Sequence, residues 1–200
     1  MNLSYWETKT WFSNIDFCII GSGLTGLNCA LGLKERFPKS KILILERGIL
    51  PNGASTKNAG FACFGSVSEI LDDLNSHSEE EVLQLVQKRL KGLKLLRKNL
   101  GDQNIRYKEY GGYELFTSED IALFEECRSA LPQLNNMLKP IFGDAVFSVQ
   151  KDSFGFKNIQ KKLIFNQFEG QLNTGRMMET LLYKVQKAGI KILDNITVEE

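Results

Sequence analysis

The pattern of apolar and polar positions predicts two buried strands joined by a helix near the start of the chain. An apolar run, made of Ile15 and residues 17–20, leads directly into the glycine-rich segment Gly21 to Gly26, and the predicted helix continues through Ala30. Residues Lys41 to Leu45, apolar after the lysine, predict a second buried strand that ends at Glu46. This order of elements forms a β-α-β unit, which is typical of a parallel sheet.

The middle of the chain carries a different pattern, with long helices followed by short strands. Glu79 to Leu100 places apolar side chains at helical spacing, which predicts an amphipathic helix packed on a core. Ile105 to Thr117 predicts strand, bend and strand, and residues 118–120 predict the start of a helix that runs toward Leu138. Residues 142–168 are aromatic and β-like, so we expect antiparallel strands there.

The last segment predicts a return to the first pattern. From Asn173 the sequence indicates a capped helix, then Gly189, then a strand from Ile190 through Val198. The apolar face of this helix consists of Met178, Leu181, Leu182 and Val185. A parallel strand needs neighbours, and the sequence stops close behind this one. We therefore expect the amino-terminal portion of a longer protein.

The glycine-rich segment between the first strand and helix predicts a dinucleotide site. Gly21 permits the tight turn, Gly23 lets the backbone approach a pyrophosphate, and Gly26 lets the helix pack close to the strand. The first amides of the helix then face the phosphate charges, and the helix dipole adds to the attraction. The remaining predicted site residues of this turn are Ser22, Leu24 and Thr25.

Glu46 extends the predicted site, since it follows the second strand about 20 residues after Gly26, where a ribose-binding carboxylate is expected. A carboxylate there disfavours a cofactor phosphorylated on the 2′-hydroxyl, because two negative groups would face each other. Arg47 weakens that objection.

Residues 47–61 are rich in glycine, asparagine and serine, which predicts an irregular loop with free amides and hydroxyls. This loop resembles that of the D-amino-acid-oxidase-like group of FAD-dependent oxidoreductases, which includes glycine oxidase, sarcosine oxidase and gamma-glutamylputrescine oxidase. In that group the acid after the second strand is followed by Gly-Ala-Ser-Gly-Arg-Asn-Gly-Gly or a variant. Gly53, Ala54, Ser55, Asn58 and Gly60 match the pattern, whereas Thr56, Lys57 and Ala59 depart from it. Tyr5, Trp6 and Trp11 also resemble this group; alternatively they pin a terminal arm to the domain.

The resemblance implies FAD as the cofactor, because in that group the loop runs along the pyrophosphate and reaches the isoalloxazine. Besides the glycine turn and Glu46, the cofactor-binding residues that it implies are Arg47, Ala54, Ser55, Thr56, Lys57, Asn58, Ala59, Gly60 and Val198. It also implies an enzyme that oxidises the C–N bond of a small amine or amino acid by hydride transfer to the flavin, followed by hydrolysis of the imine. Catalytic residues are expected in the carboxy-terminal part, outside this sequence.

The expected fold class is α/β, with a Rossmann-like FAD-binding domain built on a parallel sheet. Part of an α+β substrate domain with antiparallel strands is expected as an insertion. We expect residues 1–75 to form the first part of the FAD-binding domain, residues 76–170 the substrate-domain portion, and residues 171–200 the return helix and strand.

Charge and hydropathy exclude two classes of partner. The 25 basic and 24 acidic residues leave a net charge of +1, which predicts no nucleic-acid binding. No apolar stretch has the length of a membrane span, and the amino terminus lacks the apolar centre of a signal peptide, so we expect a cytoplasmic protein. No pattern in the sequence predicts the oligomeric state.

The cysteines and the single histidine add no predicted metal site. Cys18, Cys29, Cys63 and Cys127 lack metal-ligand spacing. Cys63 follows the loop, and its alternatives are a covalent flavin link or redox role and ordinary packing. No basic neighbour in the sequence would lower the pKa of its thiol, which favours packing. His77 lies in a polar run and is expected at the surface rather than as a catalytic base.

Two alternatives stay open. An NAD-dependent dehydrogenase shares the glycine turn and Glu46 but does not need the loop, so changes at Ser55 and Asn58 would leave its cofactor affinity unchanged. The other alternative is a non-catalytic, truncated interaction domain. A further flavin motif in the reading frame beyond Glu200 would exclude it.

Overall fold

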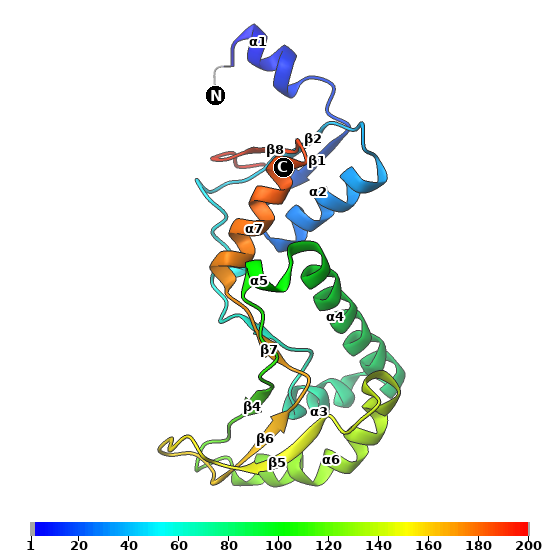
Figure 1. Cartoon of the computed structure of the whole chain (residues 1–200), viewed down its shortest axis with the longest axis vertical. Helices are drawn as coiled ribbons and strands as arrows, with labels where there is room; N and C mark the ends of the chain where they lie inside the picture. Colours follow the sequence, from blue (N-terminus) through cyan, green and yellow to red (C-terminus); the bar gives the residue numbers. More distant parts are fainter. Residues whose placement is uncertain (1–2, 200) are drawn as a thin grey trace. The chain divides into compact units, whose positions relative to one another are not determined.

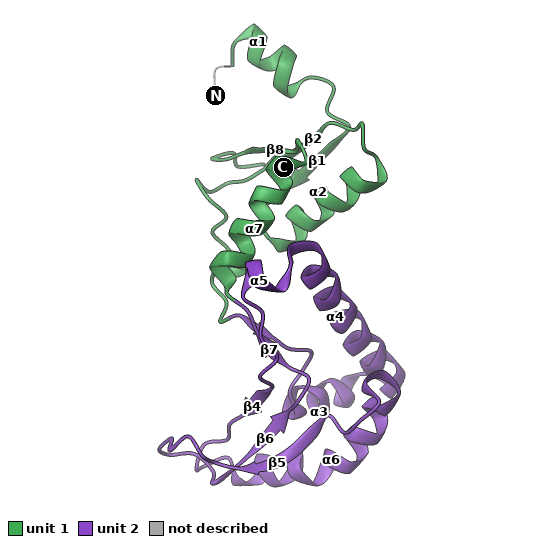
Figure 2. Ribbon diagram, in the orientation of Figure 1, with its two compact units in different colours: residues 1–59, 173–200 green, residues 60–172 purple. Residues whose placement is uncertain are grey.

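The computed structural model describes residues 3–199 and divides into two compact units (Figure 2). Unit 1 combines the amino-terminal residues through Ala59 with the segment from Asn173 onward, and unit 2 is Gly60–Leu172. The sequence placed the divisions after residues 75 and 170. The first division falls earlier because helix α3 (Val67–Ser76) packs in the core of unit 2. The assignment of the two units to cofactor and substrate binding stays a prediction.

Unit 1 contains the predicted parallel sheet. Its strands are β1 (Phe17–Ile20), β2 (Ile42–Leu45) and β8 (Lys191–Leu193), in the order β1-β2-β8 (Figure 1). Both pairs are parallel, and Ile44 of β2 lies between Ile19 and Ile192 in the register. Helix α2 (Leu24–Arg36) connects β1 to β2, and α7 (Thr174–Lys187) leads into β8. The predicted Rossmann-like arrangement is confirmed.

Two helices supply the apolar cover of this sheet. Helix α2 packs on β1 and β2, and α7 packs on α2 and β8. Leu27 and Ala30 of α2 and Leu181 and Val185 of α7 are fully buried. Burial of these side chains against the strands provides the main free-energy gain of unit 1.

The final strand is shorter than predicted. The sequence predicted a strand from Ile190 to Val198, but the ladder ends at Leu193. Asn195 has a positive φ of 64°, and its amide donates to the Gly48 carbonyl at 2.9 Å. Ile196 donates its amide to the Glu46 carbonyl at 2.8 Å. The chain therefore folds over the end of β2 instead of extending the strand.

The amino-terminal aromatics lie in α1 (Tyr5–Glu7) and the following π-helix η1 (Thr8–Phe12). Tyr5 and Trp6 are 64% and 69% exposed, so these two rings do not pin the arm, whereas the centre of the Trp11 ring lies 5.1 Å from the Lys191 ammonium of β8. The ammonium of Lys41 donates to the carbonyls of Thr10 and Ser13, at 3.1 and 2.7 Å, and thereby holds the end of η1.

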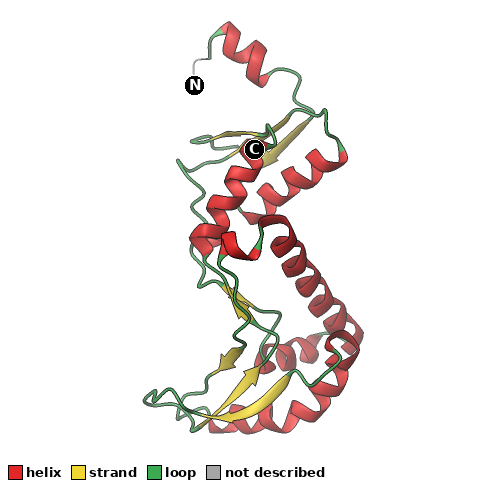
Figure 3. Cartoon of the chain, viewed as in Figure 1, coloured by secondary structure: helices red, strands yellow, loops and turns green. Residues whose placement is uncertain are grey.

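Unit 2 has an antiparallel sheet covered by helices (Figure 3). The sheet order is β4-β6-β5, with β4 (Gly112–Glu114), β5 (Phe147–Lys151) and β6 (Lys162–Asn166), while β3 (Phe61–Ala62) pairs separately with β7 (Gly170–Gln171). The helices are α3, α4 (Glu79–Leu100), α5 (Asp102–Ile105) and α6 (Ile121–Phe142). Helix α4 has both predicted bounds. The α+β part of the fold class is confirmed.

The prediction of two strands over Ile105 to Thr117 is confirmed only in part. Ile105 ends the short helix α5, Lys108 forms an isolated antiparallel bridge with Gln171, and the strand of this segment is Gly112–Glu114. Gly101 (φ 84°) ends α4, and left-handed Arg106 (φ 52°) ends α5. Two turns within six positions leave no room for an extended segment before residue 107.

Candidate functional site

The glycine turn between β1 and α2 in unit 1 has a backbone conformation that depends on its glycines. Gly21 adopts a φ of 94°, which favours glycine, and its amide donates to the Leu45 carbonyl at 2.7 Å. A Cβ atom on Gly26 would lie 2.0 Å from the Gly21 carbonyl oxygen. Only glycine at position 26 therefore permits this approach of α2 to the turn.

Glu46 anchors the turn to the end of β2. One carboxylate oxygen accepts from the amide of Ser22 at 2.8 Å and from its hydroxyl at 2.7 Å, and the other accepts from the Gly48 amide at 2.9 Å. Burial acts to raise the pKa of Glu46, but these hydrogen bonds and the charge of Arg47 lower it below the ordinary value. A carboxylate has about four lone-pair positions, so it can still accept another donor. Its contact with a ribose stays a prediction.

The glycine-rich loop closes onto the first turn of α2. The Ser55 hydroxyl, in the 3-10 turn η2 (Ala54–Thr56), accepts from the Leu24 amide at 2.9 Å. The N-cap residue of α2 is Gly23, which has no side chain to cap the helix, so Ser55 supplies that contact from a distant part of the chain.

The Asn58 side chain holds the same loop through hydrogen bonds within the loop and to helix α7. Its amide group donates to the carbonyls of Ala54 and Ser55, at 3.2 and 3.0 Å, and its carbonyl oxygen accepts from the Thr174 hydroxyl at 2.8 Å. Thr56 bonds back to the Gly53 carbonyl at 3.1 Å. These side chains determine the shape of the loop.

A cavity of about 490 Å³ lies at the carboxyl ends of the strands in unit 1. Of the predicted site residues it gathers Gly21, Gly23, Glu46, Arg47, Ser55 and Val198. Ligands of open α/β sheets bind at this edge. The predicted residues that do not line the cavity are Ser22, Leu24, Thr25, Gly26, Ala54, Thr56, Lys57, Asn58, Ala59 and Gly60.

Several lining residues were not predicted from the sequence. They are Ile20, Leu45, Gly48, Pro51, Asn52, Gly53, Ile196 and Thr197. The turn-forming series Pro51-Asn52-Gly53 is a signal that marks part of this wall. Ile196 and Thr197 reach the cavity through the backbone bonds of residues 195 and 196, which no local pattern encodes.

The amino end of α2 offers two unused donors. Helix amides at the first positions have no partner within the helix. Among residues 3–199, the amides of Thr25 and Gly26 have no hydrogen-bond acceptor, whereas the Leu24 amide is used by Ser55. The donors and the positive helix end suit an anionic group such as a pyrophosphate.

The remaining candidates, Cys63 and His77, belong to unit 2. Desolvation and the nearby charges of Glu169 and Glu69 raise the pKa of the Cys63 thiol, although its side chain is exposed, so a thiolate is disfavoured. His77 is the exposed C-cap residue of α3. Within the described part of the chain there is no cluster of metal-ligating side chains and no helix long and apolar enough to cross a membrane.

Solved structures share this fold at low sequence identity. L-Amino acid deaminase from Proteus myxofaciens superposes with a TM-score of 0.65 and 18% identity, over 92% of this chain and 38% of that one. Glycine oxidase from Geobacillus kaustophilus has a TM-score of 0.58 and 20% identity, over 90% and 46%. Glycine oxidase from Bacillus cereus has a TM-score of 0.59 and 19% identity, over 93% and 49%. The chain thus spans less than half the length of these enzymes.

No curated protein matches the sequence significantly. Residues 16–200, however, match the DAO family, described as FAD dependent oxidoreductase, and thereby include the glycine turn, Glu46 and the loop. FAD is the cofactor of that family. The chain therefore belongs to the DAO family of FAD dependent oxidoreductases.

Proposed function

We propose that this chain is part of an enzyme that oxidises the C–N bond of a small amine or amino acid with FAD as hydride acceptor. The family match supports the cofactor, and the names of the similar structures, an amino acid deaminase and two glycine oxidases, support the substrate class. A cytoplasmic location belongs to the same proposal.

The closure of the loop on the glycine turn carries the proposal. The Ser55–Leu24 hydrogen bond joins residues 31 positions apart and makes one cavity from the turn, the end of β2 and the loop. An NAD-dependent dehydrogenase needs the turn and the carboxylate but not this loop. A cavity wall that contains both the glycine turn and the loop therefore favours FAD over NAD as the cofactor.

Unit 1 has suitable groups for the pyrophosphate, the ribose and the adenine of the cofactor. We assign the pyrophosphate to the free amides of Thr25 and Gly26, which follow the cavity-lining N-cap residue Gly23 on α2. The ribose is assigned to Glu46 with Arg47 beside it, and the adenine to Val198, which also lines the cavity. When bound, FAD supplies the acceptor for a hydride from the carbon that bears the amine, and water then hydrolyses the imine.

The visible absorbance spectrum of the purified protein tests the cofactor directly. We expect a flavin spectrum, and heat should release FAD into the supernatant. A folded, colourless protein that gains no colour on incubation with FAD would contradict the proposal and favour the nicotinamide alternative. Because the catalytic residues are expected outside this sequence, amine oxidation is tested on the protein from the whole reading frame, and such a protein that keeps FAD but oxidises no amine would favour the non-catalytic alternative.

Two loop variants separate the cofactor classes further. Ser55→Ala removes the acceptor for the Leu24 amide, and Asn58→Ala removes the brace of the loop. Both are expected to lower the retained FAD per protein. Ser40→Ala is the matched control, because its hydroxyl bonds to the Phe37 carbonyl away from the cavity. Unchanged FAD retention in both loop variants would contradict the assignment.

A further inference from the structure

A second cavity, of about 370 Å³, lies within unit 2, and we call it the acidic cavity. It lies against the sheet, the amino end of α3 and the turn before β7. Its lining residues are Phe61, Cys63, Ser66, Ser68, Glu69, Gly112, Tyr113, Glu114, Phe147, Ile164, Asn166 and Glu169. The volume falls in the range of small-molecule sites. None of its residues belongs to the cavity in unit 1.

The charged side chains that line the acidic cavity are all carboxylates. Three carboxylates, those of Glu69, Glu114 and Glu169, line it, and no lysine, arginine or histidine is among the lining residues within the described chain. The nearby guanidinium of Arg89 donates to the Phe64 carbonyl at 2.9 Å. The local field therefore favours a cation in the cavity.

Two of the carboxylates are held by helix α3. Glu114 accepts from the amides of Val67 and Ser68, at 3.0 and 3.2 Å, and from the Ser68 hydroxyl. Glu69 accepts from the Ser66 amide at 2.9 Å in a capping box. These contacts fix both carboxylates and partly compensate their charges.

Glu169 differs from the other two glutamates of the cavity because neither an amide of helix α3 nor an ion pair holds its carboxylate among the described residues. The fold instead leaves space for this side chain. A Cβ on Gly112 would lie 1.9 Å from a carboxylate oxygen of Glu169, so glycine at that position provides the space. Burial, together with the charges of Glu69 and Glu114, raises the pKa of Glu169 to about 7, although the Asn166 side chain acts to lower it. A cation beside this carboxylate would relieve the desolvation and the repulsion together.

Asn166 gives an independent indication of a ligand. It is 4% exposed, and its amide nitrogen has no described residue at hydrogen-bond distance, although the side chain lies close enough to Glu169 to lower the pKa of that carboxyl. Its carbonyl oxygen accepts from the Phe168 amide at 3.0 Å. In the sheet register Asn166 lies opposite Gly112 and Phe147, which also line the cavity, so its side chain is on the cavity face. A buried donor without a partner at hydrogen-bond distance is available to an acceptor on a ligand that lies beside Glu169.

We propose that the acidic cavity binds a small organic ammonium ion that also carries a neutral oxygen acceptor. The ammonium group pairs with Glu169, and the hydroxyl or carbonyl oxygen accepts from the Asn166 amide. Aromatic side chains are available for the rest of the ligand, since Phe61, Tyr113 and Phe147 line the cavity. An aromatic face adds an attraction for an ammonium group. The inference does not depend on flavin binding in unit 1.

Calorimetric titration of the purified protein with 3-aminopropan-1-ol tests this site, at a pH above the pKa of Glu169. We expect saturable binding, weaker binding of propylamine, which lacks the oxygen, and none of butan-1-ol, which lacks the cation. Glu169→Gln removes the charge at the same size and should weaken binding about tenfold or more. The matched control is Glu125→Gln, an exposed change on α6 at a residue outside the cavity lining.

A second variant covers the case in which Glu169→Gln does not fold. Phe61 is 76% exposed and lines the cavity, so Phe61→Ala should fold and bind the probe more weakly by a few-fold. The inference is wrong if the wild-type protein does not bind 3-aminopropan-1-ol, or if Glu169→Gln and Phe61→Ala bind it like the wild type. Failure of FAD binding would leave these titrations unaffected, so the two proposals fail separately.

Discussion

Ser22 donates both its amide and its hydroxyl to a single carboxylate oxygen of Glu46, at 2.8 and 2.7 Å. This pair ties the glycine turn after β1 to the end of β2, across 24 residues of sequence. Both residues are buried, at 0% and 8% exposure, so the contact is shielded from solvent. The carboxylate that the sequence assigns to a ribose thus also holds the turn in shape.

Glu46→Gln should lower the free energy of unfolding by about 1–3 kcal/mol near neutral pH, because hydrogen bonds to a charged acceptor are replaced by weaker ones. The pKa of Glu46 is lowered in the folded state, so its contribution is complete above the ordinary pKa of 4.5 and is lost as the pH falls through the folded value. Urea unfolding at a series of pH values should show the variant and wild type converging in acid.

The control for Glu46→Gln is Glu35→Gln, an exposed position on α2. Its stability should match that of the wild type at every pH. A constant difference between Glu46→Gln and wild type down to strong acid would show that the charge of Glu46 does not stabilise the turn.

Gly26→Ala should destabilise the protein by at least about 1–3 kcal/mol, because the added methyl group meets the Gly21 carbonyl oxygen at 2.0 Å and forces the turn apart. Gly32→Ala, on the same helix, has no atom within 4 Å of the added carbon and should stabilise by about 0.5–1 kcal/mol. Thermal unfolding of the two variants compares them directly. Equal effects would show that the close packing at Gly26 is absent.

Features encoded by neighbouring residues were predicted well from the sequence. The glycine spacing predicted the turn from β1 into α2, and the helix Glu79–Leu100 was predicted with both bounds because its ends are local. Ser78 and Glu81 form its capping box, and Gly101 stops it.

Features that depend on residues far apart in sequence were missed. Glu69, Glu114 and Glu169 meet in one cavity although each is unremarkable in its own segment. The shortened strand β8 likewise depends on the bond from the Asn195 amide to Gly48, which no periodicity signals. Pairings of this kind are set by tertiary packing, which overrides local propensity.

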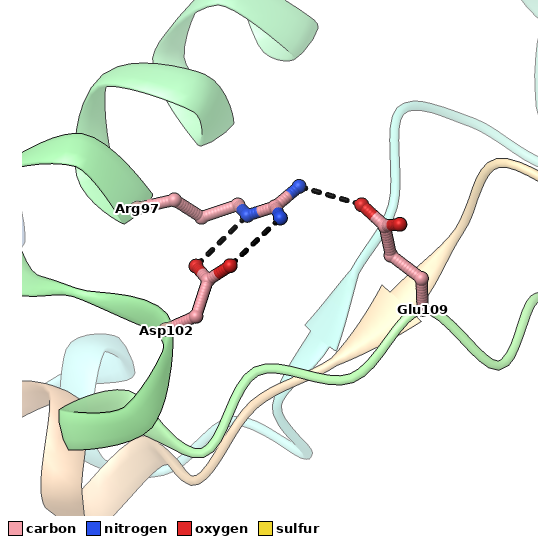
Figure 4. Close-up of polar contacts among 3 residues, drawn as sticks. All are labelled: Arg97, Asp102 and Glu109. Atoms are coloured by element: carbon pink, nitrogen blue, oxygen red, sulfur yellow. Dashed lines mark hydrogen bonds and ion pairs between the residues drawn. The ribbon is translucent and has the colours of Figure 1, made fainter.

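Arg97→Lys should destabilise unit 2 by about 1 kcal/mol, because lysine cannot reproduce the planar geometry of the guanidinium. Arg97 bonds to both oxygens of Asp102, at 2.9 and 2.8 Å, and to Glu109 at 2.7 Å (Figure 4). Its guanidinium also lies 3.9 Å from the centre of the Tyr107 ring. A double-mutant cycle with Asp102→Asn measures the coupling.

The pH dependence of that coupling has a definite sign. The hydrogen bonds from Arg97 lower the pKa of Asp102, so the pair stabilises the fold above the ordinary aspartate pKa of 3.8 and loses this effect as the pH falls through the folded value. A coupling energy of zero near neutral pH would show that the ion pair is fully screened by solvent.

Asn135→Ala should be among the most destabilising polar substitutions in unit 2. The Asn135 carbonyl oxygen accepts from the amides of Val146 and Phe147, at 2.9 and 2.8 Å, and its amide donates to the Phe147 carbonyl at 2.9 Å. It thereby connects α6 to the start of β5. Alanine leaves three partly buried backbone groups without this partner, which should cost about 2–4 kcal/mol in urea unfolding.

Its neighbour Asn136 is exposed on the same helix and provides the matched control. Asn136→Ala should change stability by no more than about 0.5 kcal/mol, since alanine favours a helix and no core contact is removed. If the two alanine variants were equally stable, the start of β5 would have to be held by its pairing with β6 alone. A large difference between them would show that one side chain, twelve residues away in sequence, determines where the strand begins.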